Sequence, residues 1–222
     1  MSQVTFPTTG QVFSSSALTP PQMEAIFQAL VLQIFGIAVP PANPAQAYST
    51  VRCGWPAEGQ PGPPYETDTC IVLAYPYDDP YSRVNDQNRL PNQPGAVSVT
   101  QRGAYTQVWR VHFTNYGPNC FDRARLIAAA VSTIDWVHDW LVNLCPGSGV
   151  PVVQPIYWIS EAVRPVYVPE VFQKRWWPRA DLDLRFNEFV FQTLDIPVGE
   201  SVGVTLITDT GITRTFSISA SD

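Results

Sequence analysis

Charged side chains are scarce in this sequence, and lysine is almost missing. Only 14% of the 222 residues are charged, and Lys174 is the single lysine beside twelve arginines. The net charge of −6 argues against a nucleic-acid binder that neutralises many phosphates, although a local basic patch remains open. Arginine is enriched at protein interfaces, where lysine is depleted. The arginine excess therefore favours an assembling protein, and a codon bias of the source genome would explain it equally well.

Long apolar runs and targeting signals are missing as well. No stretch approaches the roughly 18 apolar residues that cross a bilayer, and the start MSQVTFPTTG lacks the basic and apolar regions of a signal peptide. We therefore expect a protein that is made and kept in the cytoplasm and has no membrane partner.

Cysteine is sparse and widely spaced. The gaps between Cys53, Cys70, Cys120 and Cys145 match neither a CxxC pair nor a zinc-ligand pattern. Cysteines of cytoplasmic proteins are normally reduced. The spacing therefore predicts four thiols, mostly buried and inert, with no metal site and no bound cofactor.

Histidine is nearly absent, and the common catalytic motifs are missing. The sequence has no HExxH, GxSxG, Walker loop or GxGxxG. His112 falls on the polar parity of an alternating segment, which favours a solvated or hydrogen-bonded surface role. His138 lies on an apolar helical stripe between Ile134 and Leu141, where a hydrogen-bonded core residue is the commoner finding. Neither histidine therefore indicates catalysis.

A pair of carboxylates is the best remaining candidate for acid and base chemistry. Asp181 and Asp183 are two residues apart in a strand pattern, so they project from one face and could hold a cation or move a proton. Arg179 and Arg185 share that face, which favours a cross-strand ladder of charges instead. We therefore predict that the protein is not an enzyme.

The composition supports one substantial core with long connections. Hydrophobic residues make up 45% of the chain, which suffices for a core without metal or disulfides, and 22 prolines indicate long, stiff loops. We expect a single α+β domain over residues 1–222. It would carry an N-terminal arm at 1–17 and extended loops or arms at 56–69, 76–96 and 160–179.

Two helices are indicated by their start and stop signals. Thr19 is expected as the N-cap of the first helix, with prolines in the first turn, a capping-box Gln22 and a C-terminal Gly36. Asn119 is expected as the N-cap of a second helix that runs to about Leu144. This second helix has apolar residues on two sides, which predicts two packing partners and the burial of Ile127, Val131 and Ile134.

Strand patterns occupy much of the remainder. Segments with strand character lie at Tyr48–Trp55, Cys70–Tyr75, Tyr105–Thr114 and Val152–Ile159, and a half-exposed strand begins near Leu182. Two apolar segments that flank Asp209–Gly211 predict a C-terminal β-hairpin. The expected fold is thus α+β, with a β-sheet packed against two main helices.

The segment from Arg164 to Arg179 combines arginine with large aromatic residues. Its three prolines predict an irregular arm. Adjacent tryptophans between arginines are typical of stacking platforms for single-stranded nucleic acid or carbohydrate, and also of protein interfaces. On an acidic chain we favour the protein interface. The alternative is a purely structural role, in which one tryptophan fills the core. The candidate interface residues are Arg164, Tyr167, Phe172, Arg175, Trp176, Trp177 and Arg179.

Part of the chain resembles a known family. The residues that carry the likeness are Tyr116, Gly117, Pro118, Asn119, Asp122, Arg123, Ala124 and Arg125, followed by PIYWISEAVRPVYVPEVFQKRWWPRADLDLRFNE. They resemble the neck terminator (tail terminator) proteins of tailed bacteriophages. The resemblance covers about Tyr105 to Glu188, with weaker similarity at Val51 to Pro56, and Cys120 is a small departure from the pattern.

The resemblance implies a structural virion protein with a terminator-like α+β domain. Such proteins form a ring, usually a homohexamer, at the junction of tail and neck, where it ends growth of the tail tube and serves head–tail joining. The implied partners are further copies of the chain, the tail tube protein and neck connector or adaptor proteins, with the tail sheath as a further candidate. Genomic DNA would pass through the lumen without specific binding, and assembly would take place in the host cytoplasm.

A carbohydrate-binding module, or a small glycan-acting protein, is the competing class. Seven tryptophans and nine tyrosines could supply platforms on which sugars stack. Such a module would remain monomeric and bind glycans, whereas a terminator would form rings and bind tube or neck subunits.

Overall fold

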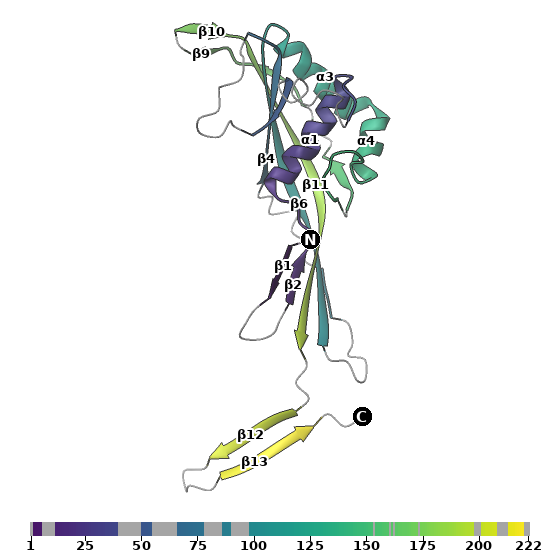
Figure 1. Ribbon diagram of the computed structural model, residues 1–222, viewed down its shortest axis with the longest axis vertical. Helices are drawn as coiled ribbons and strands as arrows, with labels where there is room; N and C mark the ends of the chain where they lie inside the picture. Colours follow the sequence, from purple (N-terminus) through teal and green to yellow (C-terminus); the bar gives the residue numbers. More distant parts are fainter. Residues whose placement is uncertain are drawn as a thin grey trace. The chain divides into compact units, whose positions relative to one another are not determined.

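The chain divides into two compact units in the computed structural model (Figure 1). The core unit comprises Ser16–Val84 and Tyr105–Val190, and the strand unit comprises Met1–Ser15, Asn85–Ala104 and Phe191–Asp222. The structure describes residues 2–5, 12–39, 50–54, 66–77, 86–89, 98–152, 154–159, 161, 163–172, 174–197, 201–207 and 213–219. The fold is α+β, as the sequence predicted.

The core unit is built on a sheet in which the strands follow the order β11, β6, β4, β3. Their bounds are β3 Val51–Cys53, β4 Thr69–Tyr77, β6 Ser98–Tyr116 and β11 Arg179–Pro197. β3 is parallel to β4, and β4 is antiparallel to β6. Two short strands, β7 Ile156–Trp158 and β8 Val166–Tyr167, pair with β11 in antiparallel fashion. Each strand expected in this unit is therefore present, with shifted bounds.

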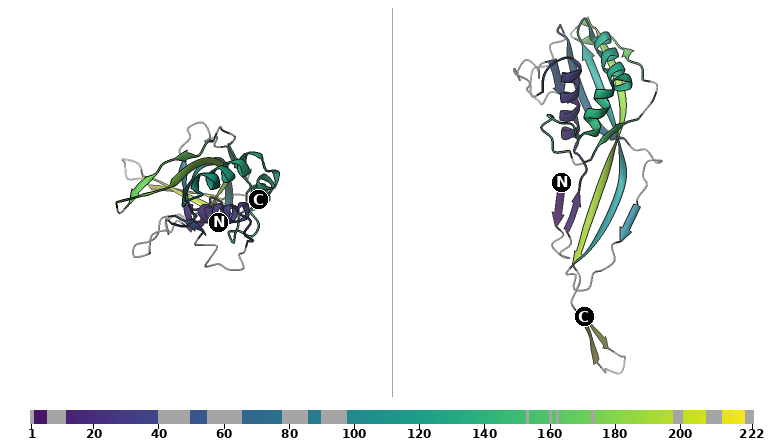
Figure 2. Two further views of the ribbon diagram at one scale, coloured as in Figure 1. Left: turned by 90° about the horizontal axis from the view of Figure 1, so that it is seen from above. Right: turned by 90° about the vertical axis from the view of Figure 1, so that its right-hand side faces the viewer.

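Side-chain alternation gives this sheet one apolar and one polar face. Trp109, Val111 and Phe113 of β6 are buried, as are Leu182, Leu184 and Phe186 of β11. Because successive residues of a strand point to opposite faces, Arg110 and His112 share the other face with Asp181 and Asp183. Helices cover the apolar face (Figure 2), and Phe27 of the first helix packs 4.4 Å from Phe186 between ring centroids.

Helix α1 (Pro20–Ile34) begins and ends where its sequence signals predicted. The Gln22 side chain accepts the backbone N–H of Thr19 at 2.9 Å, which satisfies a donor that the helix itself cannot. At the other end Gly36 adopts φ +75, and the N–H groups of Gly36 and Ile37 bond back to the carbonyls of Gln33 and Leu32. This pattern is a Schellman motif, for which glycine is favoured because its φ is positive.

The second predicted helix is two helices, so the expected continuous run to about Leu144 is wrong. α3 spans Cys120–Thr133 and α4 spans Asp135–Val142, with extended backbone at Ile134 between them. The hydroxyls of Ser132 and Thr133 both bond back to the carbonyl of Ala129, which competes with the helical pattern. Because the helix breaks at Ile134, the carbonyl of Val131 needs another donor. His138 provides it, since its Nε2 donates to this carbonyl at 2.6 Å.

The break also changes which residues of this segment are buried. Ile127 and Val131 are fully enclosed as predicted, whereas Ile134 is only half-buried. On the second apolar side of the predicted helix, Ala130, Val137 and Trp140 are buried, whereas Leu126 and Leu144 are exposed. The buried residues of α3 and α4 nevertheless belong to one hydrophobic core.

A buried carboxylate connects the start of α1 to the sheet. Glu188 of β11 is 2% exposed, accepts the backbone N–H of Leu18 at 2.8 Å with one oxygen and accepts the indole N–H of Trp109 at 2.8 Å with the other. Burial raises the pKa of Glu188, and these two hydrogen bonds lower it by less. Sequence patterning did not indicate this contact, because the position falls in the alternating run of apolar residues.

The strand unit consists of paired strands. Their bounds are β1 Ser2–Thr5, β2 Val12–Ser15, β5 Asp86–Arg89, β12 Ser201–Ile207 and β13 Thr213–Ser219. β1 pairs with β2, which also pairs with β11, and β5 pairs with β6. β12 and β13 form the predicted antiparallel C-terminal hairpin. Asp209–Gly211 and the greater part of the loops expected at 56–69 and 76–96 lie outside the described residues.

Candidate protein-interaction surface

Charged side chains form a paired ladder on the polar face of the core-unit sheet. Arg110 donates through Nε and Nη2 to the two carboxylate oxygens of Asp183 at 3.0 and 2.8 Å, and His112 Nδ1 lies 2.9 Å from Asp183 Oδ1. Arg179 makes a second two-pronged pair with Asp181, at 2.8 Å for both bonds. A cross-strand pairing of charges is thus present at Asp183, and the hydrogen-bonded surface role of His112 is confirmed, whereas Arg179 pairs with Asp181 of its own strand.

These pairs shift the ionisation of their members. Burial alone would raise the pKa of Asp183, but hydrogen bonds from His112 and Arg110 outweigh it and hold this pKa well below its usual range. The hydrogen bond to Asp181 raises the pKa of Arg179 above its ordinary value. Asp183 therefore remains ionised in a fixed ion pair, so it is poorly suited to exchange protons with a substrate.

A pocket of about 400 Å³ opens beside the ladder, and Arg110, Asp181 and Asp183 of the ladder line one part of it. Tyr77, Arg164 and Glu161 contribute to its wall. Arg185 is paired with Glu161 through both Nε and Nη2. Most charged side chains in the pocket wall are already paired, so Arg164 is the one charge among its described lining residues that is left for a small-molecule ligand.

Beyond the ladder the chain forms a hairpin that the sequence did not predict. β9 (Glu170–Phe172) pairs antiparallel with β10 (Arg175–Trp177), and Lys174 adopts φ +63 in the turn. The expectation of an irregular arm is therefore wrong. Pro165, Pro169 and Pro178 fall just outside the short strands, where a missing N–H breaks no ladder bond.

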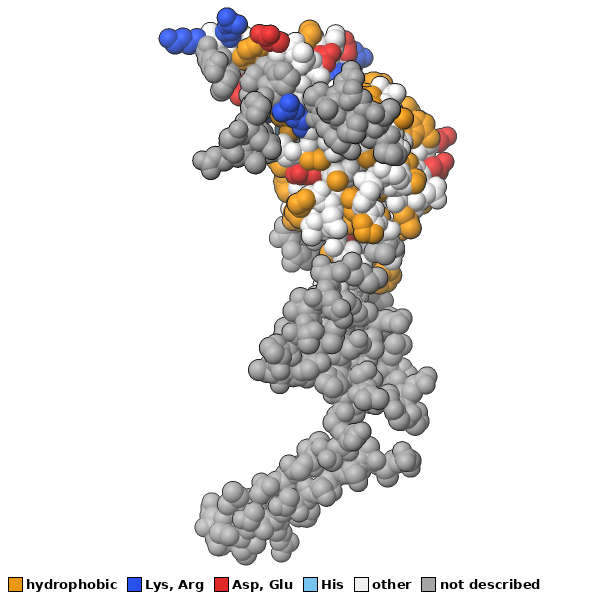
Figure 3. Space-filling view, in the orientation of Figure 1, with side chains coloured by type: hydrophobic (Ala, Val, Ile, Leu, Met, Phe, Trp, Pro, Cys, Tyr) orange, Lys and Arg blue, Asp and Glu red, His pale blue; other side chains and the backbone are white. Residues whose placement is uncertain are grey.

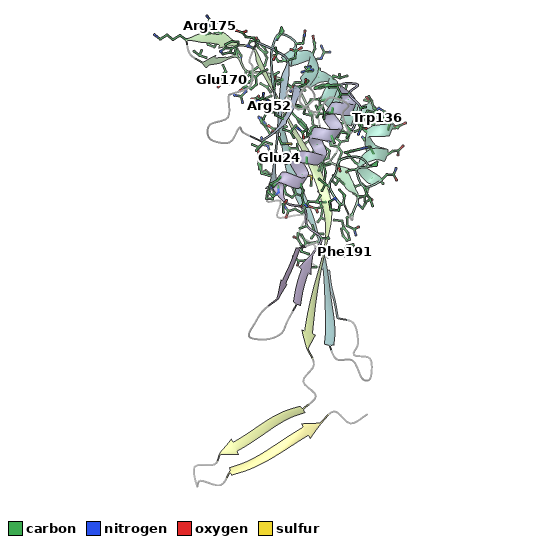
Figure 4. The ribbon with its side chains drawn as sticks, in the orientation of Figure 1. Glu24, Arg52, Trp136, Glu170, Arg175 and Phe191 are labelled. Carbon is green, nitrogen blue, oxygen red and sulfur yellow. The ribbon has the colours of Figure 1, made fainter. Side chains whose placement is uncertain are left out.

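Polar contacts on one face of the hairpin attach it to the core unit. Glu170 accepts the Tyr116 hydroxyl at 2.8 Å and Arg179 Nη1 at 3.1 Å, and Trp177 on the same face is half-buried. The preceding strand β8 continues the attachment, with Tyr167 opposite Ala180 of β11. The hairpin is thus a fixed part of the core unit (Figure 4).

The opposite face of the hairpin is apolar and exposed. Trp176 and Val171 are direct cross-strand partners, so they lie on the same face, and they are 72% and 54% exposed. Lys174 and Arg175 at the tip are exposed and have no partner among the described residues. Arg175 is the cross-strand partner of Phe172, so it reaches solvent at the tip from the Glu170 face and borders the apolar face of Val171 and Trp176. We call Val171 and Trp176, together with the two tip cations Lys174 and Arg175, the hairpin surface. Trp176 and Trp177 point to opposite faces and so cannot form one flat stacking platform.

The candidate interface residues predicted from sequence are thus in different environments. Arg175 and Trp176 are on the hairpin surface, and Tyr167 is exposed with its ring 6.5 Å from that of Phe121 on α3. Arg164 is exposed beside the pocket, while Arg179 is engaged in internal ion pairs. The side chain of Phe172 lies outside the described part of the structure.

A second exposed surface was missed by sequence reasoning. Asp135, Asp139 and Val142 follow one another at helical spacing along α4, with Trp136 beside them, and all four are exposed. We call these four residues the α4 surface. The sequence pattern did not reveal this surface, because one continuous helix was predicted. The helix break at Ile134 changes which residues of α4 share an exposed face.

Metal and membrane sites find no support in the described residues. Across that part of the chain no group of three or more His, Cys, Asp or Glu is arranged to hold a metal ion. Cys70, Cys120 and Cys145 are buried and Cys53 is exposed, all as free thiols. Within the described segments, no helix has the length and apolar character to cross a membrane.

Comparison with known proteins adds one finding to this geometry. A model of the phage neck terminator protein family matches residues 22–211, a span that begins in α1 and ends beyond the hairpin surface and β12. No curated protein matches the chain.

Proposed function

The chain belongs to the phage neck terminator protein family, and we propose that six copies of it form a ring at the head-proximal end of the tail. It is a structural protein of the phage neck and tail. In this proposal the ring ends growth of the tail tube and joins the tail to the neck. Its partners are further copies of itself, the tail tube protein and the neck connector or adaptor proteins, with the tail sheath as an additional candidate.

The observation that carries this proposal is the hairpin surface. A tryptophan that is 72% exposed is unusual in a protein that acts alone, since tryptophan and arginine are the residues on which interface energy concentrates. The ladder beneath holds the hairpin in place, so little conformational freedom would be lost when it contacts a partner. Genomic DNA would pass the ring without specific binding, in keeping with the net charge of −6.

The test is a double variant of the hairpin surface, Arg175→Ala with Trp176→Ala. Both side chains are exposed, so we expect a folded subunit that no longer forms rings or joins the tail tube. The matched control is Tyr157→Ala, which removes a half-exposed aromatic side chain from β7. Mass measurement of the purified protein, alone and with tail tube protein, and electron microscopy of assembled tails provide the readouts. Normal tail length and normal head joining in the double variant would refute the assignment of this surface.

A further inference from the structure

The hairpin surface and the α4 surface lie on opposite sides of the core unit. Figures 1 and 2 place β9 and β10 on one side and α4 on the other, in views that differ by a quarter turn. Figure 4 labels Arg175 and Trp136 at these two extremes. Both surfaces belong to the same compact unit, so their separation is fixed by one core.

The two surfaces are complementary in charge. The tip of the hairpin carries two cations, Lys174 and Arg175, and basic side chains are visible at this place in Figure 3. The α4 surface carries two carboxylates, Asp135 and Asp139, and acidic side chains are visible over α4 in the same view. None of these four charges has a partner among the residues that the structure describes.

The two surfaces also match in their apolar parts. The hairpin exposes the cross-strand pair of Val171 and Trp176, and α4 exposes Trp136 and Val142, each 41% accessible. An exposed ion pair contributes little by itself, so contact between these apolar groups would supply most of the affinity while the charges select the orientation. Each surface therefore has the apolar centre and charged rim of a protein interface.

We propose that the hairpin surface of one copy binds the α4 surface of the next copy in the ring. The proposal rests on the proposed function, which it deepens by naming the two contacting surfaces. A contact between two different surfaces of the same chain is heterologous, and repetition of such a contact closes a ring when the rotation between copies permits. The charged ladder is not available for this role, because Arg110, Arg179 and Arg185 are already paired within the subunit.

The experiment uses two charge reversals, each with a matched control. Arg175→Glu makes the hairpin tip less basic, and Asp139→Lys changes the sign of one charge on α4. The controls are Arg125→Glu and Asp122→Lys, which make the same changes at exposed positions of α3. Far-UV circular dichroism and thermal melting verify that all four variants are folded, and sedimentation velocity over a dilution series measures assembly.

Each reversal alone should weaken ring formation, since like charges then face each other across the contact. We expect the association constant to fall at least about tenfold, and the two controls to assemble as the unchanged protein does. An equal mixture of the two reversed proteins should recover assembly, because the glutamate introduced in the hairpin of the first protein meets the lysine introduced on α4 of the second. Only a direct contact between the two surfaces predicts this recovery.

The outcomes separate this contact from the proposed function. Rings that form normally in both reversals would overturn the contact and leave the proposed function standing. Normal rings that fail to join the tail tube when Arg175 is reversed would assign the hairpin to an axial partner and would also overturn the contact. If the unchanged protein forms no ring, either alone or with tail tube protein, the proposed function fails and this contact fails with it.

Discussion

Replacing Glu188 with glutamine is expected to loosen the attachment of α1 to the sheet. In the folded protein each carboxylate oxygen accepts one donor at 2.8 Å, the backbone N–H of Leu18 or the indole N–H of Trp109. Glutamine keeps a single oxygen, so one of these buried donors would face an amide NH₂. Loss of a partner for one buried donor costs about 1–3 kcal/mol. At about 2–4 °C per kcal/mol for a chain of this size, the Tm should fall by about 2–12 °C.

The same variant has a signature in its pH dependence. Burial raises the pKa of Glu188, so above about pH 4.3, the unfolded value, the folded state holds a proton that the unfolded chain has already released. The free energy of unfolding of the unchanged protein therefore falls as the pH rises from there through the raised pKa. Glutamine does not titrate, so the free energy of unfolding of Glu188→Gln lacks this decrease with rising pH. The difference in Tm between the two proteins should thus narrow as the pH rises.

Thermal unfolding followed by circular dichroism, at about pH 5 and about pH 8, measures both effects. Glu66→Gln is the matched control, because Glu66 is exposed and its replacement should change stability by less than about 0.5 kcal/mol. A Tm for Glu188→Gln equal to that of the unchanged protein would contradict the hydrogen-bond account. A Tm difference that widens as the pH rises would contradict the sign of the pKa shift.

Three further predictions concern the core, the ladder and the thiols. Ile127→Asp should abolish cooperative thermal unfolding, since an unpaired charge at a fully buried position costs several kcal/mol, and a Tm near that of the unchanged protein would refute it. Asp183→Asn should cost only about 0.5–1 kcal/mol in urea unfolding near neutral pH, because the side chain is 39% exposed. This loss should shrink progressively as the pH falls below the unfolded value of about 3.9 towards the lowered pKa of Asp183 in the folded state; a loss that stays constant as the pH falls through this range would count against the ion pair. Thiol titration of denatured protein should find all four cysteines free, while in the native state Cys70 and Cys145 should stay unreactive because burial raises the pKa of each to about 12. Fewer than four thiols, or bound zinc in metal analysis, would refute the last prediction.

The sequence was most informative where short-range chemistry decides the structure. The start of α1 depends on Thr19 and Gln22, three residues apart, and its end depends on the positive φ of Gly36, so both could be predicted. The strands that contain Val111 and Leu184 could be predicted from the alternation of apolar and polar residues alone. These signals act within a few residues and need no knowledge of tertiary contacts.

Prediction failed where contacts along or across the chain override the local pattern. Apolar periodicity carried the second helix through Ile134, although two adjacent hydroxyls and His138 end α3 there. Three prolines suggested an irregular arm, but each lies outside the strands of the hairpin. The hairpin side of the candidate site was found from its tryptophan and arginine content. The α4 side was missed, because the residues that share its exposed face can be identified only when the helix break at Ile134 is known.

The hydrogen bond from Leu18 to Glu188 spans 170 residues, and this separation constrains the order of events during synthesis. β11, the strand that contains Glu188, comes late in the chain yet lies next to β6 in the sheet. The docking site of α1 is therefore incomplete until Glu188 has been synthesised, and contacts this distant in sequence close slowly. Lys174 and Trp176 leave the ribosome before β11 does, so they first appear on a chain that cannot yet hold them in a hairpin. A nascent subunit is consequently unable to assemble through the hairpin until β11 has been synthesised.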